Sequence, residues 1–106
     1  MAQKLSGGCA CGAIRYECEA APVMMVNCHC RDCQRANGAA YAAVLAVPLA
    51  ALRLQGEPRY HRVIAASGKG IERGFCPNCG SQLMVKLDLL PDMIELHAGS
   101  LDDPSV

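Results

Sequence analysis

The chain has 106 residues, with ten Lys and Arg balancing ten Asp and Glu, eight Cys, and an aromatic content of only 4%. A net charge of zero disfavours a nucleic-acid-binding domain, which is usually strongly basic, and the apolar stretch 39–52 is too short to span a bilayer. At this length we expect one domain over residues 1–106. Its core would be poor in large side chains, so the cysteines are the candidate source of extra stability.

The hydrophobic pattern has a period of two residues along most of the chain, which predicts short strands. Within 13–19, Ile14, Tyr16 and Cys18 alternate with charged residues. In chain order, further strands are predicted at Val23–Val26, Ala40–Val47, Arg53–Leu54, Arg59–Ile64, Gly70–Phe75, Gln82–Lys86 and Met93–His97. Turns rich in glycine and proline separate several of them, at 56–58, 67–70 and 90–92. The pattern therefore predicts a mainly β domain.

Two segments carry helical signals. The segment from Asp32 to Asn37 is predicted to form one short helical turn, which Gly38 ends. The Ala-rich stretch that begins at Ala39 suits a helix by composition, whereas the aromatic and β-branched side chains within it suit a strand. The sequence leaves this second segment open.

Seven of the eight cysteines form three clusters, which are Cys9 with Cys11, then Cys28, Cys30 and Cys33, then Cys76 with Cys79. The sequence has no secretory signal at its start, so we expect a cytoplasmic protein. In a reducing cytosol, cysteines at tight spacings are more often metal ligands or catalytic groups than disulfides.

The first and last clusters are predicted to share one structural zinc. Cys76 and Cys79 form a tight knuckle in which Gly80 can adopt a positive φ. This pair supplies half of a tetrahedral site. Cys9 and Cys11 are flanked by glycines that let the chain bend, so they are predicted to supply the other half.

The middle cluster is predicted to hold a second, catalytic zinc. Three protein ligands leave a fourth position for water or substrate, so Cys28, Cys30 and Cys33 are the candidate catalytic residues. A substrate thiol in that position would be deprotonated at neutral pH, and a carbonyl would be polarised. The neighbouring Arg31 and Arg35 could offset the negative charge of the thiolates or attract an anionic substrate.

Other interpretations of these residues stay open. An even number of cysteines permits disulfides, and His29 is an alternative fourth ligand for the middle cluster. His61 and His97 are predicted to be ordinary strand histidines, although one of them could approach the open site.

The remaining side chains of interest receive structural interpretations. Cys18 is predicted to be a buried apolar residue. Met24, Met25 and Met84 are predicted to fill the core, and Arg15 and Arg73 to be solvated strand residues.

Three separated motifs carry a resemblance to a known family. They are Gly7–Glu17, Cys28–Arg35 with Gly38-Ala39 following, and Arg73–Ser81, and the tail Gly99–Pro104 fits the same pattern. From about Leu5 to its end, the chain resembles the glutathione-dependent formaldehyde-activating enzyme (GFA) family, which shares its domain with centromere protein V.

The resemblance implies a β-tent of short antiparallel sheets stapled by zinc. It implies two zinc ions per chain, a structural one on Cys9, Cys11, Cys76 and Cys79 and a catalytic one on Cys28, Cys30 and Cys33. It also implies a reaction in which glutathione adds to formaldehyde to give S-(hydroxymethyl)glutathione, catalogued in reverse as a carbon–sulfur lyase. Zinc would hold the glutathione sulfur as a thiolate beside the aldehyde carbon.

Two classes of function follow. The first is a zinc-dependent carbon–sulfur lyase that acts on a small glutathione-like thiol and an aldehyde, without nucleic-acid or membrane partners. The alternative is a non-catalytic, zinc-stapled protein-binding module. Family members commonly continue past the Leu101–Pro104 segment, so we expect this chain to lack the usual C-terminal extension and to form a homo-oligomer that covers the exposed apolar edge.

Overall fold

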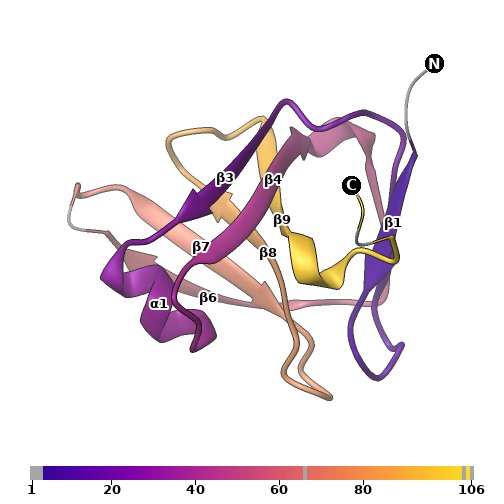
Figure 1. The fold of residues 1–106 in the computed structure, drawn as a ribbon, viewed down its shortest axis with the longest axis horizontal. Coiled ribbons are helices and arrows are strands. Elements are labelled where there is room, and N and C mark those ends of the chain that lie inside the picture. The colour runs from indigo at the N-terminus through magenta and orange to yellow at the C-terminus, as the bar shows by residue number, and fades with distance from the viewer. Residues whose placement is uncertain (1–3, 66, 104, 106) are drawn as a thin grey trace.

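The computed structural model describes residues 4–65, 67–103 and 105. Within these residues the chain forms nine strands, one α-helix and two short 3-10 helices (Figure 1). The strands form two antiparallel sheets, which confirms the predicted mainly β fold. The ends of the predicted domain, Met1 and Val106, and one residue of the family-like tail, Pro104, lie outside the described residues.

The two sheets differ in size. The smaller one has the order β1-β2-β5 and comprises β1 (Leu5–Gly8), β2 (Arg15–Cys18) and β5 (Leu52–Gln55). The larger one has the order β3-β4-β9-β8-β7-β6 and comprises β3 (Met24–Cys28), β4 (Ala42–Pro48), β6 (Arg59–Ile64), β7 (Gly70–Phe75), β8 (Gln82–Leu87) and β9 (Met93–His97). In Figure 1 the smaller sheet stands at the right, across from the larger one.

The predicted strands are all present, and one further strand was not predicted. The bounds of β6, β7 and β9 agree with the predictions residue by residue. The additional strand is β1, whose sequence Leu-Ser-Gly-Gly has no hydrophobic alternation. It forms because it pairs with β2, and a Cβ on Gly7 would overlap the Tyr16 hydroxyl and the Ser100 carbonyl, so the glycine permits this close approach.

The short helix α1 (Arg31–Asn37) follows β3 and confirms the predicted helical turn. The sulfur of its N-cap residue, Cys30, accepts a hydrogen bond from the Cys33 backbone N–H at 3.3 Å. At the other end Gly38 has φ 72°, a left-handed conformation that glycine adopts without strain. The Ala-rich segment after it becomes β4, because it is paired on both sides, with β3 and with β9.

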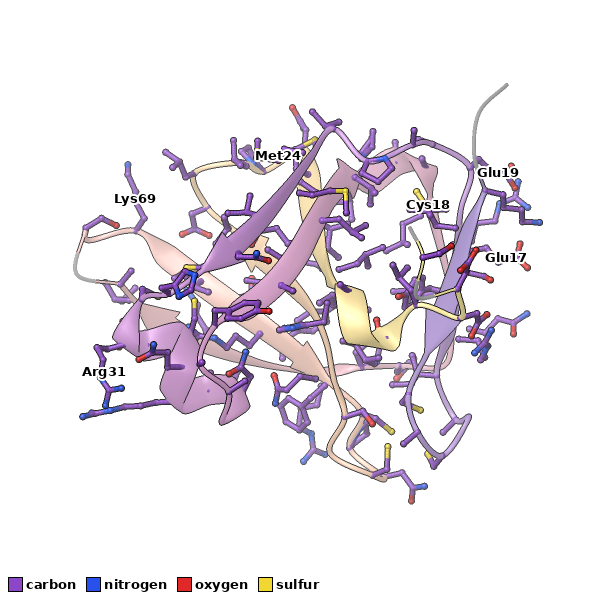
Figure 2. The ribbon with its side chains drawn as sticks, in the orientation of Figure 1. Glu17, Cys18, Glu19, Met24, Arg31 and Lys69 are labelled. Atoms are coloured by element: carbon purple, nitrogen blue, oxygen red, sulfur yellow. The ribbon has the colours of Figure 1, made fainter. Side chains whose placement is uncertain are left out.

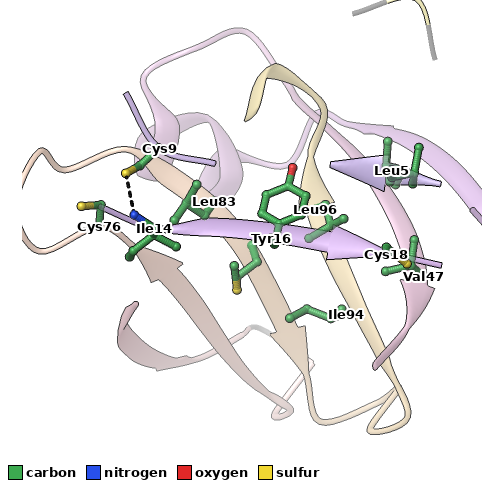
Figure 3. Packing of buried hydrophobic residues seen from close by; sticks show 12 residues of the cluster. Leu5, Cys9, Ile14, Tyr16, Cys18, Val47, Cys76, Leu83, Ile94 and Leu96 are labelled. Carbon is green, nitrogen blue, oxygen red and sulfur yellow. Dashed lines mark hydrogen bonds between the residues drawn. The ribbon is translucent and has the colours of Figure 1, made fainter. Parts of the chain in front are cut away.

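The core lies between the two sheets. Tyr16 from the smaller sheet packs among Leu45, Leu83 and Leu96 of the larger one, and all four are almost fully buried (Figure 3). Each such side chain contributes about 1.5–3 kcal/mol through burial. The Tyr16 hydroxyl lies 2.6 Å from the Ser100 hydroxyl, so its polar end is satisfied.

The structural predictions for sulfur-containing side chains have mixed outcomes. Cys18 and Met84 are fully buried, as predicted. Met24 and Met25 are 45% and 58% exposed, so the prediction that they fill the core is wrong. Figure 2 shows Met24 on the outer side of β3 and Cys18 pointing inward from β2. The reason is that β3 is an edge strand whose side chains are exposed along most of its length.

The larger sheet has a second face, opposite the core. Leu45, Ile94 and Leu96 face the core, so their strand neighbours point the other way. The strand registers place Val44 beside His97 and Val85 beside Glu95, on that second face. Helix α1 lies at its β3 end in Figure 1. Among the described residues, no helix is long and apolar enough to cross a membrane.

Candidate functional site

The first and last cysteine clusters meet in space. Cys9 and Cys11 lie in the loop after β1, Cys76 and Cys79 lie in the loop after β7, and these two loops lie close together at the bottom of Figure 1. The ligand atoms of all four residues lie within 4.8 Å of one another. The Sγ atom of Cys11 lies 3.6 Å from the Sγ atom of Cys9 and 3.8 Å from the Sγ atom of Cys76. A tetrahedral zinc with bonds of about 2.3 Å needs sulfurs roughly 3.8 Å apart, so this group could hold a zinc ion.

Hydrogen bonds orient two of these sulfurs. The Ile14 backbone N–H donates to Cys9 Sγ at 3.3 Å, and the Asn78 side-chain amide donates to Cys11 Sγ at 3.2 Å. Such donors stabilise a thiolate and fix its direction, as outer partners of metal ligands usually do.

The knuckle after β7 supports the other two. Gly80 has φ 79° and its N–H donates to the Cys76 carbonyl at 2.8 Å, which closes the predicted turn. Hydrogen bonds from the hydroxyl and the backbone of Ser81, together with others, lower the pKa of Cys79 to about 5. The lowered pKa favours the thiolate of Cys79, the form that binds a metal.

The middle cluster joins the end of β3 to the start of α1. The ligand atoms of Cys28, Cys30 and Cys33 lie within 4.8 Å of one another, and the Sγ atoms of Cys28 and Cys33 are 3.4 Å apart. Because Cys28 ends a strand and Cys30 caps the helix, the direction change between the two elements brings three sulfurs together within six positions of sequence. This group could also hold a metal ion.

The three thiols of the middle cluster share protons unequally. Hydrogen bonds from the side chain and backbone of Cys33 lower the pKa of Cys30. Burial, followed by hydrogen bonds to Cys30 and Cys28, raises the pKa of Cys33 to about 12. The Cys33 thiol thus donates a hydrogen bond to the Cys28 sulfur. A bound cation would replace that shared proton.

His29 is not part of the middle cluster as the described residues form it. Its ring stacks at a tilt on Tyr41, with the ring centroids 5.1 Å apart. The ring nitrogens of His29 do not join the three sulfurs within 4.8 Å, so the structure does not favour His29 as the fourth ligand. Arg31 also points away from the cluster, and its guanidinium donates to Gln34 (Figure 2).

A pocket of about 220 Å³ lies against the middle cluster. It occupies the second face of the larger sheet, between that face and α1. Its exposed walls are mainly apolar, and five polar or ionisable side chains line it besides the three cysteines. The lining residues are Val26, Cys28, Cys30, Cys33, Ala36, Asn37, Ala42, Val44, Ile71, Arg73, Gln82, Val85, Leu87, Glu95 and His97.

Three ionisable side chains enter this pocket from the middle strands of the sheet. Burial raises the pKa of Glu95, with which no described side chain forms a hydrogen bond or ion pair. Burial, and then the charge of Arg73, lowers the pKa of His97. Buried ionisable groups with perturbed pKa values beside a cleft are typical of functional sites.

The sequence predicted a place in the site for only some of these three residues. His97 was predicted as an ordinary strand histidine that could approach the site, and it lines the pocket, whereas His61 is exposed on β6. Arg73, predicted as a solvated strand residue, is half-buried on β7 and lines the pocket. Glu95 was missed, because a charged residue between Ile94 and Leu96 also fits an ordinary half-buried strand.

Arg15 is half-buried, and its guanidinium donates two hydrogen bonds to the Asp102 carboxylate. The same aspartate accepts from the Ser6 hydroxyl at 2.8 Å. This arginine therefore ties the chain end to the smaller sheet. It does not line the pocket beside the middle cluster.

The fold and the two cysteine groups define a cysteine-rich β-protein with two potential metal centres, one of them beside a pocket. Residues 4–106 match the family described as "Glutathione-dependent formaldehyde-activating enzyme", and the chain belongs to this GFA family. The resemblance of the sequence motifs is thereby confirmed.

Two relatives extend this comparison. A Halomonas elongata protein provisionally named glutathione-dependent formaldehyde-activating enzyme is 30% identical over 103 residues, which cover 92% of this chain and 66% of the relative. This chain thus spans about two thirds of that relative's length. A Rhodobacter sphaeroides protein of known crystal structure has the same fold, with a TM-score of 0.73 and 20% identity over 94% of this chain and 92% of its own.

Proposed function

We propose that the protein is a zinc-dependent enzyme that adds a thiol to an aldehyde, with glutathione and formaldehyde as the partners named in the family's description. In the reverse direction the same enzyme is a carbon–sulfur lyase. The observation that carries the proposal is the group of Cys28, Cys30 and Cys33, three potential ligands that line a pocket large enough for a substrate.

The donor set supports zinc at both cysteine groups. Thiolates are soft ligands that suit zinc better than oxygen-seeking cations. The sulfur separations of 3.4, 3.6 and 3.8 Å are close to those that the zinc–sulfur bond length requires. Under the proposal the four-cysteine group is structural and the three-cysteine group catalytic. Zinc bound at the latter would supply one chemical effect, since it would lower the pKa of a thiol that enters the fourth position.

Two side chains of this protein, His97 and Glu95, would transfer protons during the reaction. Addition forms a carbon–sulfur bond, and the proton of the thiol ends on the aldehyde oxygen. His97 is neutral at neutral pH because its pKa is lowered, so an imidazole nitrogen can accept the thiol proton. Burial raises the pKa of Glu95, which favours the protonated carboxyl that can donate to the aldehyde oxygen. The proton that His97 accepted then returns to Glu95, so that both side chains recover their starting states.

The test is the rate at which free thiol disappears from a mixture of glutathione and formaldehyde. Because this reaction also proceeds unaided, the zinc-loaded protein is compared with buffer and with Cys30→Ser, which keeps a good helix N-cap. We expect acceleration by the native protein alone. Glu95→Gln should slow it by about 10²-fold, whereas Glu57→Gln, in an exposed turn, should not. Equal rates for protein and buffer would reject the enzyme.

The alternative, a non-catalytic zinc-stapled binding module, has one observation in its favour. The edge strand β3 and the residue before it expose apolar side chains, with Val23 at 62% and Met25 at 58%. An unpaired edge of this kind can add a strand from a partner protein. The module predicts no acceleration of the thiol reaction, and it predicts partner binding that Met25→Lys abolishes.

We further propose that the protein works in the reducing cytoplasm and that a single domain spans the chain. All eight cysteines are free in the structure, and reduced thiols at these positions are what metal binding requires. The family match over residues 4–106 supports a single GFA-like domain.

A further inference from the structure

The second face of the larger sheet carries apolar side chains beside Arg73, Glu95 and His97, where a fully solvated face would be polar throughout. Val44 on β4, Val85 on β8 and Ile71 on β7 all point into the pocket beside the middle cluster. Antiparallel sheets with one solvated face usually carry polar side chains there. An apolar concave surface beside potential catalytic ligands is therefore a candidate site for an apolar group of the substrate.

The pocket is much larger than formaldehyde needs. Its volume is about 220 Å³, and an apolar cavity of roughly 150 Å³ already accepts a molecule of the size of benzene. Formaldehyde has one carbon and one oxygen, so it would leave most of the apolar wall in contact with water. The pocket has room for a group of about six to eight carbons.

A second groove, more polar than the pocket, adjoins it and offers the thiol compound a separate binding place. Asn37, Gln82 and His97 line both the pocket and the groove, and the groove continues past them to Ser81 and Ser100. A thiol compound with several polar groups suits this groove. Its sulfur would then reach the middle cluster from one side and leave the apolar pocket free on the other.

We propose that, besides formaldehyde, the enzyme takes an aldehyde with an apolar group of about six to eight carbons, which the pocket beside Cys28, Cys30 and Cys33 holds. This inference rests on the proposed function. In the reaction the sulfur bonds to the carbonyl carbon, and the electron pair of the carbon–oxygen π bond moves to oxygen. The oxygen takes up the proton that the thiol releases, so no oxidant or reductant is needed.

The first experiment measures binding without chemistry. Straight-chain primary alcohols have the carbon skeletons of the aldehydes and do not react with the protein. Their dissociation constants for the zinc-loaded chain can be measured by NMR titration. We expect each added methylene to tighten binding about fourfold, up to a plateau at six to eight carbons. Affinity that does not depend on chain length would overturn the inference.

Two variants change the size of the pocket in opposite directions. Ala36→Phe acts from the exposed surface of α1, so it should fold, and it should abolish the dependence on chain length. Leu87→Ala should move the plateau to longer alcohols. Ile64→Phe, on β6 and 65% exposed outside the pocket, is the matched control and should bind as the native chain does. Circular dichroism and zinc content verify that each variant folds.

The last measurements separate the pocket from the proposed reaction. If glutathione and hexanol bind together, the pocket belongs to the aldehyde, as inferred. If glutathione displaces hexanol, the pocket belongs to the thiol, and the inference fails. A third result is possible, in which alcohol affinity rises with chain length but the protein accelerates adduct formation from no aldehyde. This result would reject the proposed function, and the pocket would still be an apolar binding site.

Discussion

The two cysteine groups should differ in what their loss does to folding. We compare Cys79→Ser with Cys30→Ser, because both residues are exposed and neither change leaves a cavity in the core. Cys79→Ser removes a ligand from the group that joins the loops after β1 and β7. Cys30→Ser removes one from a group that lies within a single short segment.

The expected difference follows from loop closure. The sulfurs of Cys11 and Cys76 belong to residues 65 positions apart, whereas Cys28 and Cys33 are 5 positions apart. With a closure entropy that grows as (3/2)RT ln n, the long-range link restricts the unfolded chain by about 2.3 kcal/mol more than the short one. Structural zinc binding contributes roughly 10–16 kcal/mol to folding. The free energy lost with the long-range site would therefore be as large as the usual 5–15 kcal/mol stability of a whole domain.

The assay is thermal unfolding of both variants by circular dichroism, with zinc content measured on the same samples. At about 4–8 °C per kcal/mol, the closure difference alone places the midpoint of Cys79→Ser roughly 10–20 °C below that of Cys30→Ser, or leaves Cys79→Ser insoluble. Cys30→Ser should stay folded with one zinc and no activity. Equal losses of stability would refute the reasoning, because the middle cluster would then be structural as well.

Three further outcomes are expected. Elemental analysis of protein purified without added metal should give two zinc ions per chain, and a value near one, with Cys28 and Cys33 open to alkylation, would contradict the two-site proposal. Glu95→Gln should raise the unfolding midpoint at neutral pH, because burial raises the pKa of Glu95 and penalises its charged form. Glu95 contributes most to folding stability at pH values below the pKa that it has in the unfolded chain. That contribution is lost as the pH rises through the pKa of Glu95 in the folded protein. The rise in unfolding midpoint of Glu95→Gln over the native chain should therefore vanish on acidification towards pH 4.5. An equal rise at every pH would show that burial of the Glu95 charge is not its cause. Light scattering should detect a homo-oligomer that Met25→Lys on the edge strand dissociates, and a monomeric native chain at micromolar concentration would exclude that interface.

Much of the fold could be predicted because its determinants are local. The strands at 59–64, 70–75 and 93–97 follow from side-chain alternation, which depends on neighbouring residues alone. The end of α1 follows from Gly38, whose left-handed backbone conformation stops a helix. The cysteine groupings follow from spacing and from the number of ligands that zinc takes, and the structure brings the same residues together.

Other features were decided only when the chain folded. Strand β1 has no pattern of its own and exists because β2 lies beside it. Met24 and Met25 are exposed because β3 became a sheet edge, which the composition of the strand does not indicate.

The pocket shows most clearly what the tertiary structure adds. Alternation in β9 separates Ile94 and Leu96 from Glu95 and His97, so the sequence determined that these pairs lie on opposite faces. It did not determine what each face meets. The smaller sheet covers one face and makes it the core, whereas α1 and the middle cysteine cluster border the other. The site at Glu95 depends on this long-range packing, because alternation specifies the side of a strand and not its surroundings.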